Sequence, residues 1–343
     1  MKANLKKTYN YLIRAFIILA TWFFLYRQIF VKRSLEDVYN IFLEQFRTPL
    51  FLWGVVLVFL LMFVNWAIET IKWRYLIRKI EKVKFLSAYE AVFTGISVSA
   101  FLPNRVGDYF GRVFILEKAN HLEGILITII GSISQFISTI LVGSIALVFF
   151  FPLFTDTSDY FYGYLYPAVL AMLIVANFLV LLFYFNISIL SKFLKKFTRK
   201  EWKKFRDHLK AFSYFNQREL LKILMLSILR YLVFCFQFFL LLQLFQVYVP
   251  YYYSMVLIPV IYLAITAIPT IALTEIGVRG SVSIYIIGLY FSMISTESLN
   301  TDIGIFSASS MLWLINIVIP ALIGTFFVFR LKFFRKHING HGN

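Results

Sequence analysis

The sequence predicts an all-α polytopic membrane protein with about six full spans and two re-entrant, broken-helix hairpins arranged as an inverted repeat. Its 343 residues are 60% hydrophobic and only 15% charged, with a mean hydropathy of +0.78, well outside the composition of soluble domains. Several apolar runs approach the roughly 20 residues that cross a hydrocarbon core about 30 Å thick. Two other segments, 85–121 and 254–294, are interrupted by proline, glycine and charged residues.

The N-terminal repeat, residues 1–160, begins with two predicted spans. Basic residues precede span 1 (about 9–29) and follow span 2 (about 49–71), and lysine and arginine mark the cytoplasmic face of membrane proteins. Both basic groups therefore belong inside, and two crossings join them. No small-residue cleavage site follows span 1, so we expect it to be retained rather than removed as a signal peptide.

Segment 85–121 has to return to the side from which it starts. The loop 155–159 contains acids and no base, so it is expected outside, and the span 122–153 has to reach it from the cytoplasm. Because the chain is already cytoplasmic after span 2, the intervening segment cannot cross. Broken backbone survives at membrane depth only when it is buried in protein or lines a wet cavity. We therefore predict a re-entrant hairpin with its break at Pro103, Gly107 and Gly111.

The C-terminal repeat, residues 161–343, is expected to follow the same order from the opposite face. A span leads to a basic amphipathic linker (187–219), which we expect to lie on the inner leaflet. Another span, a hairpin entering from outside (254–294), the last span and a basic tail follow. The stretch "AIPTIALTEIGVRGS" (267–281) divides this hairpin into two apolar pieces of about 14 or 15 residues, short for spans. Its break is expected at Pro269, Gly277 and Gly280.

The charged residues near the two breaks are the candidate binding site. A charged side chain at the membrane centre costs roughly 2.5 to 3.5 kcal/mol, so such residues usually pair or line a pathway. Arginine presents a planar fork that holds phosphate, and helix ends at a break add backbone N–H donors. The arginines would hold a lipid phosphate, while the acids either pair with them or contact a cationic head group. The candidates are Arg105, Asp108, Arg112, Glu275 and Arg279.

Simpler roles are open for some of these polar residues. Residues 105–118 also fit an ordinary cytoplasmic loop with interfacial ion pairs, which individually contribute little. Glu69 and Arg230 are more typical of helix–helix contacts than of a site. Buried amides usually form interhelical hydrogen bonds in membranes, and this is the role we expect for Gln135, Gln237 and Asn316.

Catalytic and metal-binding patterns are scarce in the sequence. The single cysteine, Cys235, excludes an intramolecular disulfide and a thiolate metal cluster. The four histidines lie in loops or the tail, and no zinc-protease, phosphate-loop or serine-hydrolase motif is present. We therefore expect no enzyme activity, no metal and no cofactor. The net charge of +17 lies in short loops beside the spans, where it attracts anionic lipid rather than nucleic acid.

One stretch of the chain resembles a known family. Pro103, Arg105, Gly107, Asp108 and Arg112 resemble the P-x-R-x-G-[ED]-x-x-R signature of the lysylphosphatidylglycerol synthase transmembrane region. The similarity extends more loosely over nearly the whole chain. It implies the membrane region that, in bifunctional bacterial relatives, is regarded as a flippase for aminoacylated phosphatidylglycerol. The separate synthase domain has no counterpart here, so the resemblance implies no lysyl transfer.

The chain departs from the family pattern at two places. "GSISQ" (131–135) stands where many relatives carry E-R-x-x-D, and "LTEIGVRG" (273–280) stands where the second motif usually reads P-G-G-x-G. Other family members are stand-alone proteins, some of them associated with polyprenyl-linked sugar pathways. The resemblance therefore implies a lipid substrate without identifying the lipid.

The function expected from these observations is a membrane lipid translocase. It would move a phosphate-bearing head group, of an anionic or aminoacylated phospholipid or a polyprenyl-phosphate lipid, between leaflets. The alternative is a non-catalytic membrane partner that scaffolds a lipid- or glycan-modifying enzyme. A transferase would need Asp108 or Glu275 as its acid or nucleophile. Expected partners are membrane lipids and, for a scaffold, that enzyme. We expect the protein in the bacterial cytoplasmic membrane, with both termini cytoplasmic.

Overall fold

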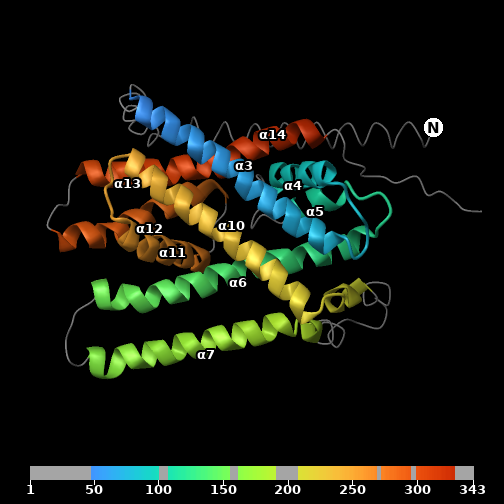
Figure 1. Cartoon of the computed structure of the whole chain (residues 1–343), viewed down its shortest axis with the longest axis horizontal. Helices are drawn as coiled ribbons and strands as arrows, with labels where there is room; N and C mark the ends of the chain where they lie inside the picture. The colour runs from blue at the N-terminus through green and yellow to red at the C-terminus, as the bar shows by residue number, and fades with distance from the viewer. Residues whose placement is uncertain are drawn as a thin grey trace, which may run out of the picture.

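The structure of the protein, a computed structural model, is helical throughout the part of the chain that it describes, and no strand occurs in that part (Figure 1). The described residues are 48–99, 107–154, 161–190, 208–268, 272–294 and 299–328. The predicted span 1, the basic tail and residues 191–207 of the predicted linker lie outside them.

Among the described residues, six apolar helical segments are long enough to cross a membrane. Apolar side chains cover both their inner and their outer faces, including exposed residues such as Leu60, Ile174 and Phe326, as expected for helices surrounded by lipid. The fold is therefore that of an all-α polytopic membrane protein. The segments are α3 (Pro49–Ile77), α6 (His121–Phe154), α7 (Tyr166–Phe185) with η2 (Phe161–Leu165), α10 (Gln217–Leu244), α12 (Ala272–Met293), and α13 (Leu299–Trp313) continued by η5 (Leu314–Val318) and α14 (Ile319–Phe327).

Helices α3 and α10 pack against each other and cross the other helices obliquely (Figure 1). The Gln237 side-chain amide donates a 2.9 Å hydrogen bond to the Val58 carbonyl, so this glutamine has the interhelical role predicted for it. A capping box between Asn216 and Glu219 begins α10, because these side chains satisfy the free backbone N–H groups of its first turn. A 3₁₀ turn, η4 (Leu209–Ser213), precedes it.

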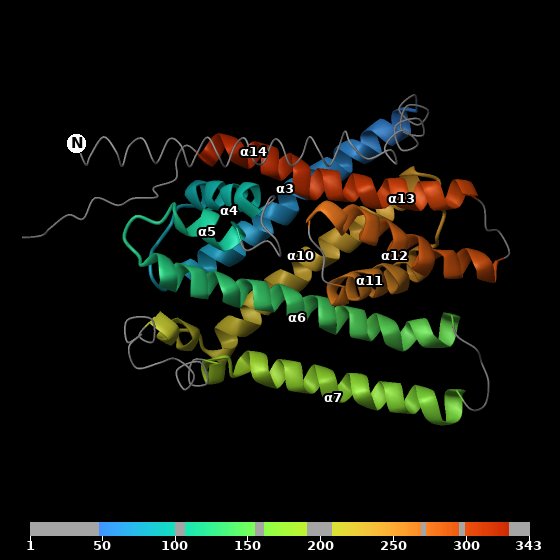
Figure 2. The same cartoon turned by 180° about the vertical axis from the view of Figure 1, so that it is seen from behind.

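The first predicted hairpin consists of α4 (Phe85–Ser99) and α5 (Gly107–Val113), which lie side by side where α3 ends and α6 begins (Figure 2). Pro103 lies outside the described residues. Gly107 begins α5, but Gly111, expected at the break, lies inside this helix. A Cβ atom at Gly111 would come within 2.5 Å of the Gly95 Cα. This glycine therefore permits close helix packing, as small residues do in membrane bundles, and does not break the helix.

The second predicted hairpin consists of α11 (Tyr251–Ala267) and α12, at the opposite end of the bundle from α4 and α5 (Figure 2). Pro269 lies outside the described residues. The expectation of two pieces of about 14 or 15 residues is wrong for α12, which has 22 residues. Gly277 and Gly280 lie inside this helix rather than at a break. The Gly280 position is filled by the Phe306 ring of α13, so close packing again accounts for a glycine.

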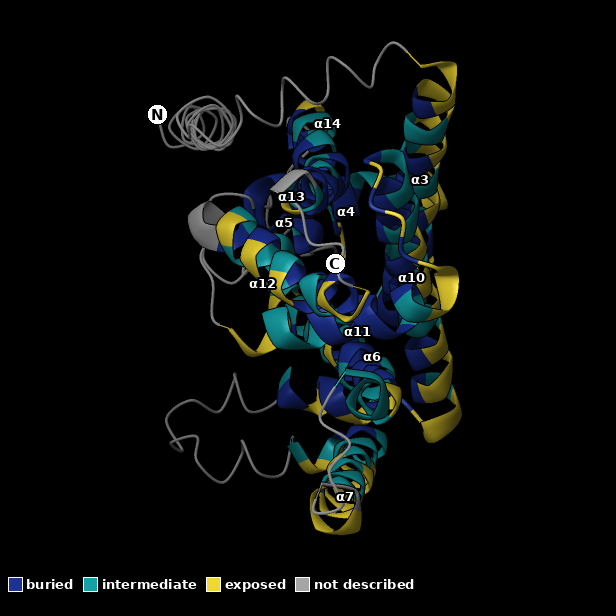
Figure 3. Cartoon of the chain, turned by 90° about the vertical axis from the view of Figure 1, so that its left-hand side faces the viewer, coloured by how far each residue is buried: buried dark blue, intermediate teal, exposed yellow. Residues whose placement is uncertain are grey.

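The last helix closes onto the first hairpin. The Ser97 hydroxyl of α4 donates a 2.5 Å hydrogen bond to the Ala321 carbonyl of α14. A Cβ atom at Gly324 would overlap the Phe93 carbonyl, so the two backbones are in contact there. By contrast, α7 lies at the edge of the bundle with most of its surface exposed (Figure 3).

The two halves present their elements in the same order. A long helix, a hairpin and a long helical segment follow one another from α3 to α6, and again from α10 to α14. The re-entrant course of the hairpins, the inverted repeat and the boundary at residue 160 stay predictions, because no membrane is present to define depth or sides.

Candidate functional site

Two buried charged residues of α3 form the centre of a polar network. Glu69 and Lys72 are three residues apart, so they share one face of the helix, and the Lys72 Nζ lies 2.7 Å from the Glu69 Oε2. Their side chains are only 7% and 2% exposed. Charges buried to this extent are costly unless they are paired. Each residue therefore stabilises the charged form of the other.

Arg112 joins this pair from the first hairpin. Its Nη1 donates to Glu69 Oε1 at 2.7 Å, while Nε and Nη2 donate to the two oxygens of Asp108 at 2.7 and 2.6 Å. Asp108 lies four residues earlier, one more than in the family signature, and this separation places both side chains on one face of α5. The guanidinium fork is therefore held by two carboxylates, in the bidentate geometry that is strongest for arginine.

Arg230 joins the network from α10. Its Nη1 lies 3.3 Å from Glu69 Oε2, and its Nε donates to the Asn65 Oδ1 at 2.8 Å. The guanidinium carbon lies 4.7 Å from the centroid of the Trp66 ring, close enough for a cation–π contact. Glu69 thus contacts three cations, Lys72, Arg112 and Arg230. With Asp108 as the second carboxylate, the network keeps one positive charge in excess.

An amide from α6 completes this network. The Gln135 Oε1 lies 3.4 Å from both the Lys72 Nζ and the Arg230 Nη1, and its Nε2 donates to the Ser227 carbonyl. The interhelical role predicted for Gln135 is confirmed, and it includes contacts with two buried cations. Asn316 differs, because its amide donates to the Leu312 carbonyl of its own helical segment.

The second charged pair lies on α12. Arg279 donates to Glu275 Oε1 through Nε at 3.0 Å and through Nη2 at 2.8 Å. The two residues are four positions apart, so the pair forms along one helix face. Their side chains are 21% and 12% exposed, so Arg279 is less enclosed than Arg112.

A small cavity brings the two charged regions together. Arg230 of α10 and Arg279 of α12 both line it. Its volume of about 30 Å³ has room for about one water molecule. Two indole N–H groups and one amide oxygen of its lining residues are buried without a hydrogen-bond partner among the described residues: those of Trp66, Trp313 and Asn316. The remaining lining residues are Phe234, Leu312 and Ile317.

The predicted site residues are therefore connected, but indirectly. Asp108 and Arg112 form one pair, Glu275 and Arg279 another, and Arg105 lies outside the described residues. Arg112 reaches Glu69, which reaches Arg230, and Arg230 shares the cavity with Arg279. Glu69 and Arg230 make the helix contacts expected of them and also join the site.

The sequence does not predict that Asn65, Lys72, Trp66 and Trp313 belong to this region. Lys72 resembles the other basic residues that follow predicted span 2, yet it lies one turn from Glu69 within α3. A tryptophan in an apolar run has no local feature that marks it as part of a cavity. Among the described residues, no group of three or more His, Cys, Asp or Glu side chains is placed to hold a metal ion.

These features define an integral membrane protein with a paired-charge network between its helices. The lysylphosphatidylglycerol synthase TM region family matches residues 11–319, most of the 343-residue chain, so the protein belongs to this family. Membership indicates a role connected with membrane lipids. No curated protein and no solved structure shows a significant match to the chain.

Proposed function

We propose that the protein is a non-enzymatic lipid translocase that moves a phosphate-bearing head group between the leaflets. The observation that carries this proposal is that two arginines from different helices, Arg230 and Arg279, line one cavity together with Trp66 of the first half. Guanidinium groups bind phosphate oxygens through paired N–H donors. The candidate substrates are an anionic or aminoacylated phospholipid and a polyprenyl-phosphate lipid, which share this phosphate.

The charge balance of the region supports an anionic ligand. The network around Glu69 has one positive charge in excess, and a phosphate would compensate it in a place where uncompensated charge is costly. The unpartnered indole N–H groups of Trp66 and Trp313 are two further donors. Buried polar groups normally have hydrogen-bond partners. These two donors are therefore available to a polar ligand that binds when the protein adopts another conformation.

The cavity itself requires that other conformation. A volume of about 30 Å³ is too small for a phosphate head group, so the head group has to enter when the surrounding helices have moved apart. Rocking of one half against the other would open the cavity to each face in turn, while the acyl chains stay in the lipid. In the closed state, Glu69 and Asp108 occupy the donors of Arg112 and so stabilise it without substrate.

Exchange of Arg279 tests this proposal. In liposomes containing a phospholipid with a fluorescent head group, Arg279→Gln is expected to reduce translocation at least tenfold, because one of the two cavity arginines is lost. The translocation rate of Arg279→Lys is expected to lie between those of the wild type and Arg279→Gln, because an ammonium keeps the positive charge but not the planar pair of N–H donors. Translocation is measured from the fraction of probe that a membrane-impermeant reductant reaches over time.

The matched control is Lys210→Gln, which removes one positive charge from an exposed position outside the cavity. Arg279→Gln alone leaves Glu275 without its partner, whereas the double variant Glu275→Gln, Arg279→Gln removes the whole α12 pair. A lower unfolding temperature of the single variant than of the double variant would reveal a folding defect caused by the unpaired Glu275. If well-folded Arg279→Gln protein translocates the probe at the wild-type rate, the proposal is wrong.

A further inference from the structure

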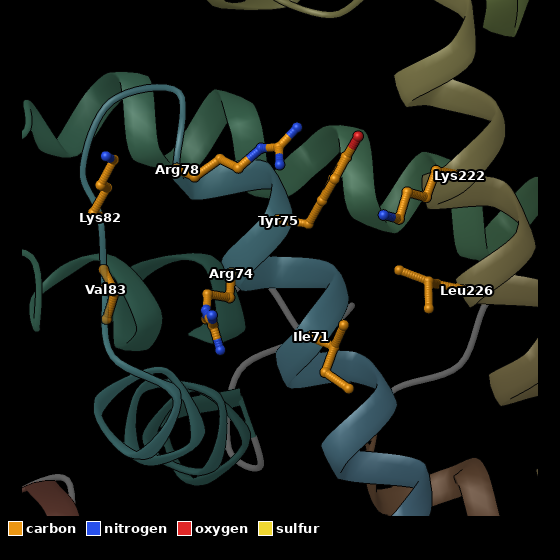
Figure 4. A pocket seen from close by; sticks show the side chains of 8 residues that line it. All are labelled: Ile71, Arg74, Tyr75, Arg78, Lys82, Val83, Lys222 and Leu226. Atoms are coloured by element: carbon orange, nitrogen blue, oxygen red, sulfur yellow. The ribbon is translucent and has the colours of Figure 1, made fainter.

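A second pocket opens on the outer side of α3, at the end where this helix approaches the start of α10 (Figure 4). Its volume is about 420 Å³, within the range of sites for small molecules. Four of its residues are cations, none is an acid, and the rest are apolar or aromatic. The lining residues are Ile71, Arg74, Tyr75, Arg78, Lys82, Val83, Lys222 and Leu226.

This pocket is separate from the network around Glu69. The α3 residues that line it are spaced by three or four positions, so they share one face of the helix. Glu69 and Lys72 lie on the opposite face, which is buried against the bundle. Helix α3 thus carries charge on two sides, and the cations on the inner side are closely paired with carboxylates.

The pocket has more positive charge than its neighbours compensate. Arg78 lies 3.2 Å from Glu219 and stacks over the Tyr75 ring at 3.7 Å, but Glu219 also pairs with Lys79 at 2.8 Å. In Figure 4, Lys222 extends from α10 toward Tyr75, and its Nζ lies 4.9 Å from the centre of that ring.

Arg74 and Lys82 carry the uncompensated charge. Both are exposed, and neither forms an ion pair or a side-chain hydrogen bond with another described residue. Like charges that line one pocket raise one another's electrostatic energy, so an anion bound in the pocket would be stabilised.

An apolar surface adjoins the cationic end of the pocket. Ile71 lies one turn from Arg74 along α3 and is 46% exposed, and Leu226 lies one turn from Lys222 along α10. Met225 and Leu229 continue this apolar surface along α10, 53% and 49% exposed. Ile71 precedes the basic residues along α3, whereas Leu226 follows Lys222 along α10. Because the two helices run in opposite directions (Figure 1), both apolar residues lie on the side of the basic residues that is nearer the middle of the bundle.

We propose that this pocket binds one glycerophospholipid with an anionic head group, taken from the leaflet at the basic end of α3. The phosphate lies among Arg74, Arg78, Lys82 and Lys222, and an acyl chain follows the apolar surface past Ile71 and Leu226. The cationic end of the pocket suits a lipid phosphate, and the adjoining apolar surface suits an acyl chain. A small soluble anion such as inorganic phosphate would use only the cationic end. This binding does not depend on lipid translocation by the protein.

Photocrosslinking tests the pocket directly. The full chain is reconstituted with a photoactivatable phosphatidylglycerol, and the labelled peptides are mapped after illumination. We expect labelling of residues 71–83 and 222–226. Each basic residue near an anionic surface contributes enough to change affinity about fivefold, so Arg74→Gln combined with Lys82→Gln should reduce this labelling at least tenfold. Both residues are exposed, so the variant is expected to fold normally.

The controls distinguish specific binding in this pocket from labelling by lipid elsewhere on the protein. Lys210→Gln, an exposed neutralisation outside the pocket, should leave labelling of the two segments unchanged, and so should Arg279→Gln in the central cavity. A photoactivatable phosphatidylcholine should label them at least fivefold less, and inorganic phosphate at millimolar concentration should not displace phosphatidylglycerol. Equal labelling in the double variant, equal labelling by phosphatidylcholine, or displacement by phosphate alone would each overturn the proposal.

Discussion

Glu69 carries most of the compensation for positive charge in the centre of the bundle. Its two oxygens lie 2.7 Å from Arg112 Nη1, 2.7 Å from Lys72 Nζ and 3.3 Å from Arg230 Nη1. Asp108 contacts only Arg112 within this group. The geometry is therefore uneven: one carboxylate from α3 connects cations of α3, α5 and α10, and the position of each cation depends on that carboxylate.

Substitution of Glu69 should be strongly destabilising. Glu69→Gln keeps the side-chain volume but leaves Lys72 and Arg230 buried without their carboxylate, and breaking a buried ion pair typically costs about 3–5 kcal/mol. We expect a large decrease in the thermal unfolding temperature of the detergent-solubilised protein. Lys79→Gln is the control, because its pair with Glu219 is partly exposed and such pairs contribute about 1 kcal/mol or less. Similar melting temperatures for the two variants would contradict this assignment.

The sequence could identify the charged residues and the pairs within one helix, but not the contacts between helices. Asp108 and Arg112 are close enough along one helix for their contact to be expected, as are Glu275 and Arg279. Glu69 is 43 residues from Arg112, and Arg230 is 165 residues from Asn65. Nothing local in the sequence joins positions so far apart, because only the packing of α3 against α5 and α10 brings them together.

The first hairpin is held by contact between two helix backbones. A Cβ at Gly111 of α5 would come within 2.5 Å of the Gly95 Cα, and a Cβ at Gly95 of α4 would overlap Asp108, so neither position has room for a side chain. In membranes, where apolar surface gives little driving force between helices, such close van der Waals packing is a main source of association. The orientation of Asp108 and Arg112 therefore depends on these glycines, because they set how closely α5 packs against α4.

Adding one methyl group at this contact should displace the hairpin. Gly111→Ala places a Cβ 2.5 Å from the Gly95 Cα, and overpacking of this kind typically costs about 1–3 kcal/mol. The expected result is a lower unfolding temperature, measured by thermal denaturation in detergent. Gly288→Ala in α12 is the control, since its Cβ would meet no atom within 4 Å. The proposed role of Gly111 is wrong if Gly111→Ala is as stable as this control.

Helix α12 marks the limit of prediction at the level of elements. The sequence indicated a break near residues 267–281, and α11 does end at Ala267. Glycine is a weaker sign of a break in membrane helices than in soluble ones, because there it also permits close packing. The helix continues through Gly277 and Gly280, of which only Gly280 is closely packed, against Phe306. The Glu275–Arg279 pair forms along it. Local composition does not distinguish these two uses of glycine.

At the scale of the whole molecule, the two halves meet at the central cavity. Trp66 belongs to the first half, whereas Arg230, Arg279 and Trp313 belong to the second. The last helix also returns to the first hairpin through the Ser97–Ala321 hydrogen bond. A relative movement of the halves would therefore change both contacts at once.

Thiol labelling tests whether the cavity opens. Asn316 lines it and is 1% exposed, so a cysteine there, in a Cys235→Ala background, is protected in the closed state. If the halves alternate, Asn316→Cys in liposomes should react slowly with a polar maleimide supplied on both sides. Ser292→Cys in the same background, at an exposed position of α12, should react fast, and the wild-type protein, whose native Cys235 is buried, should remain unlabelled. A cysteine at 316 that stays as unreactive as Cys235 would mean that this cavity never opens to water, and a head group could not pass through it.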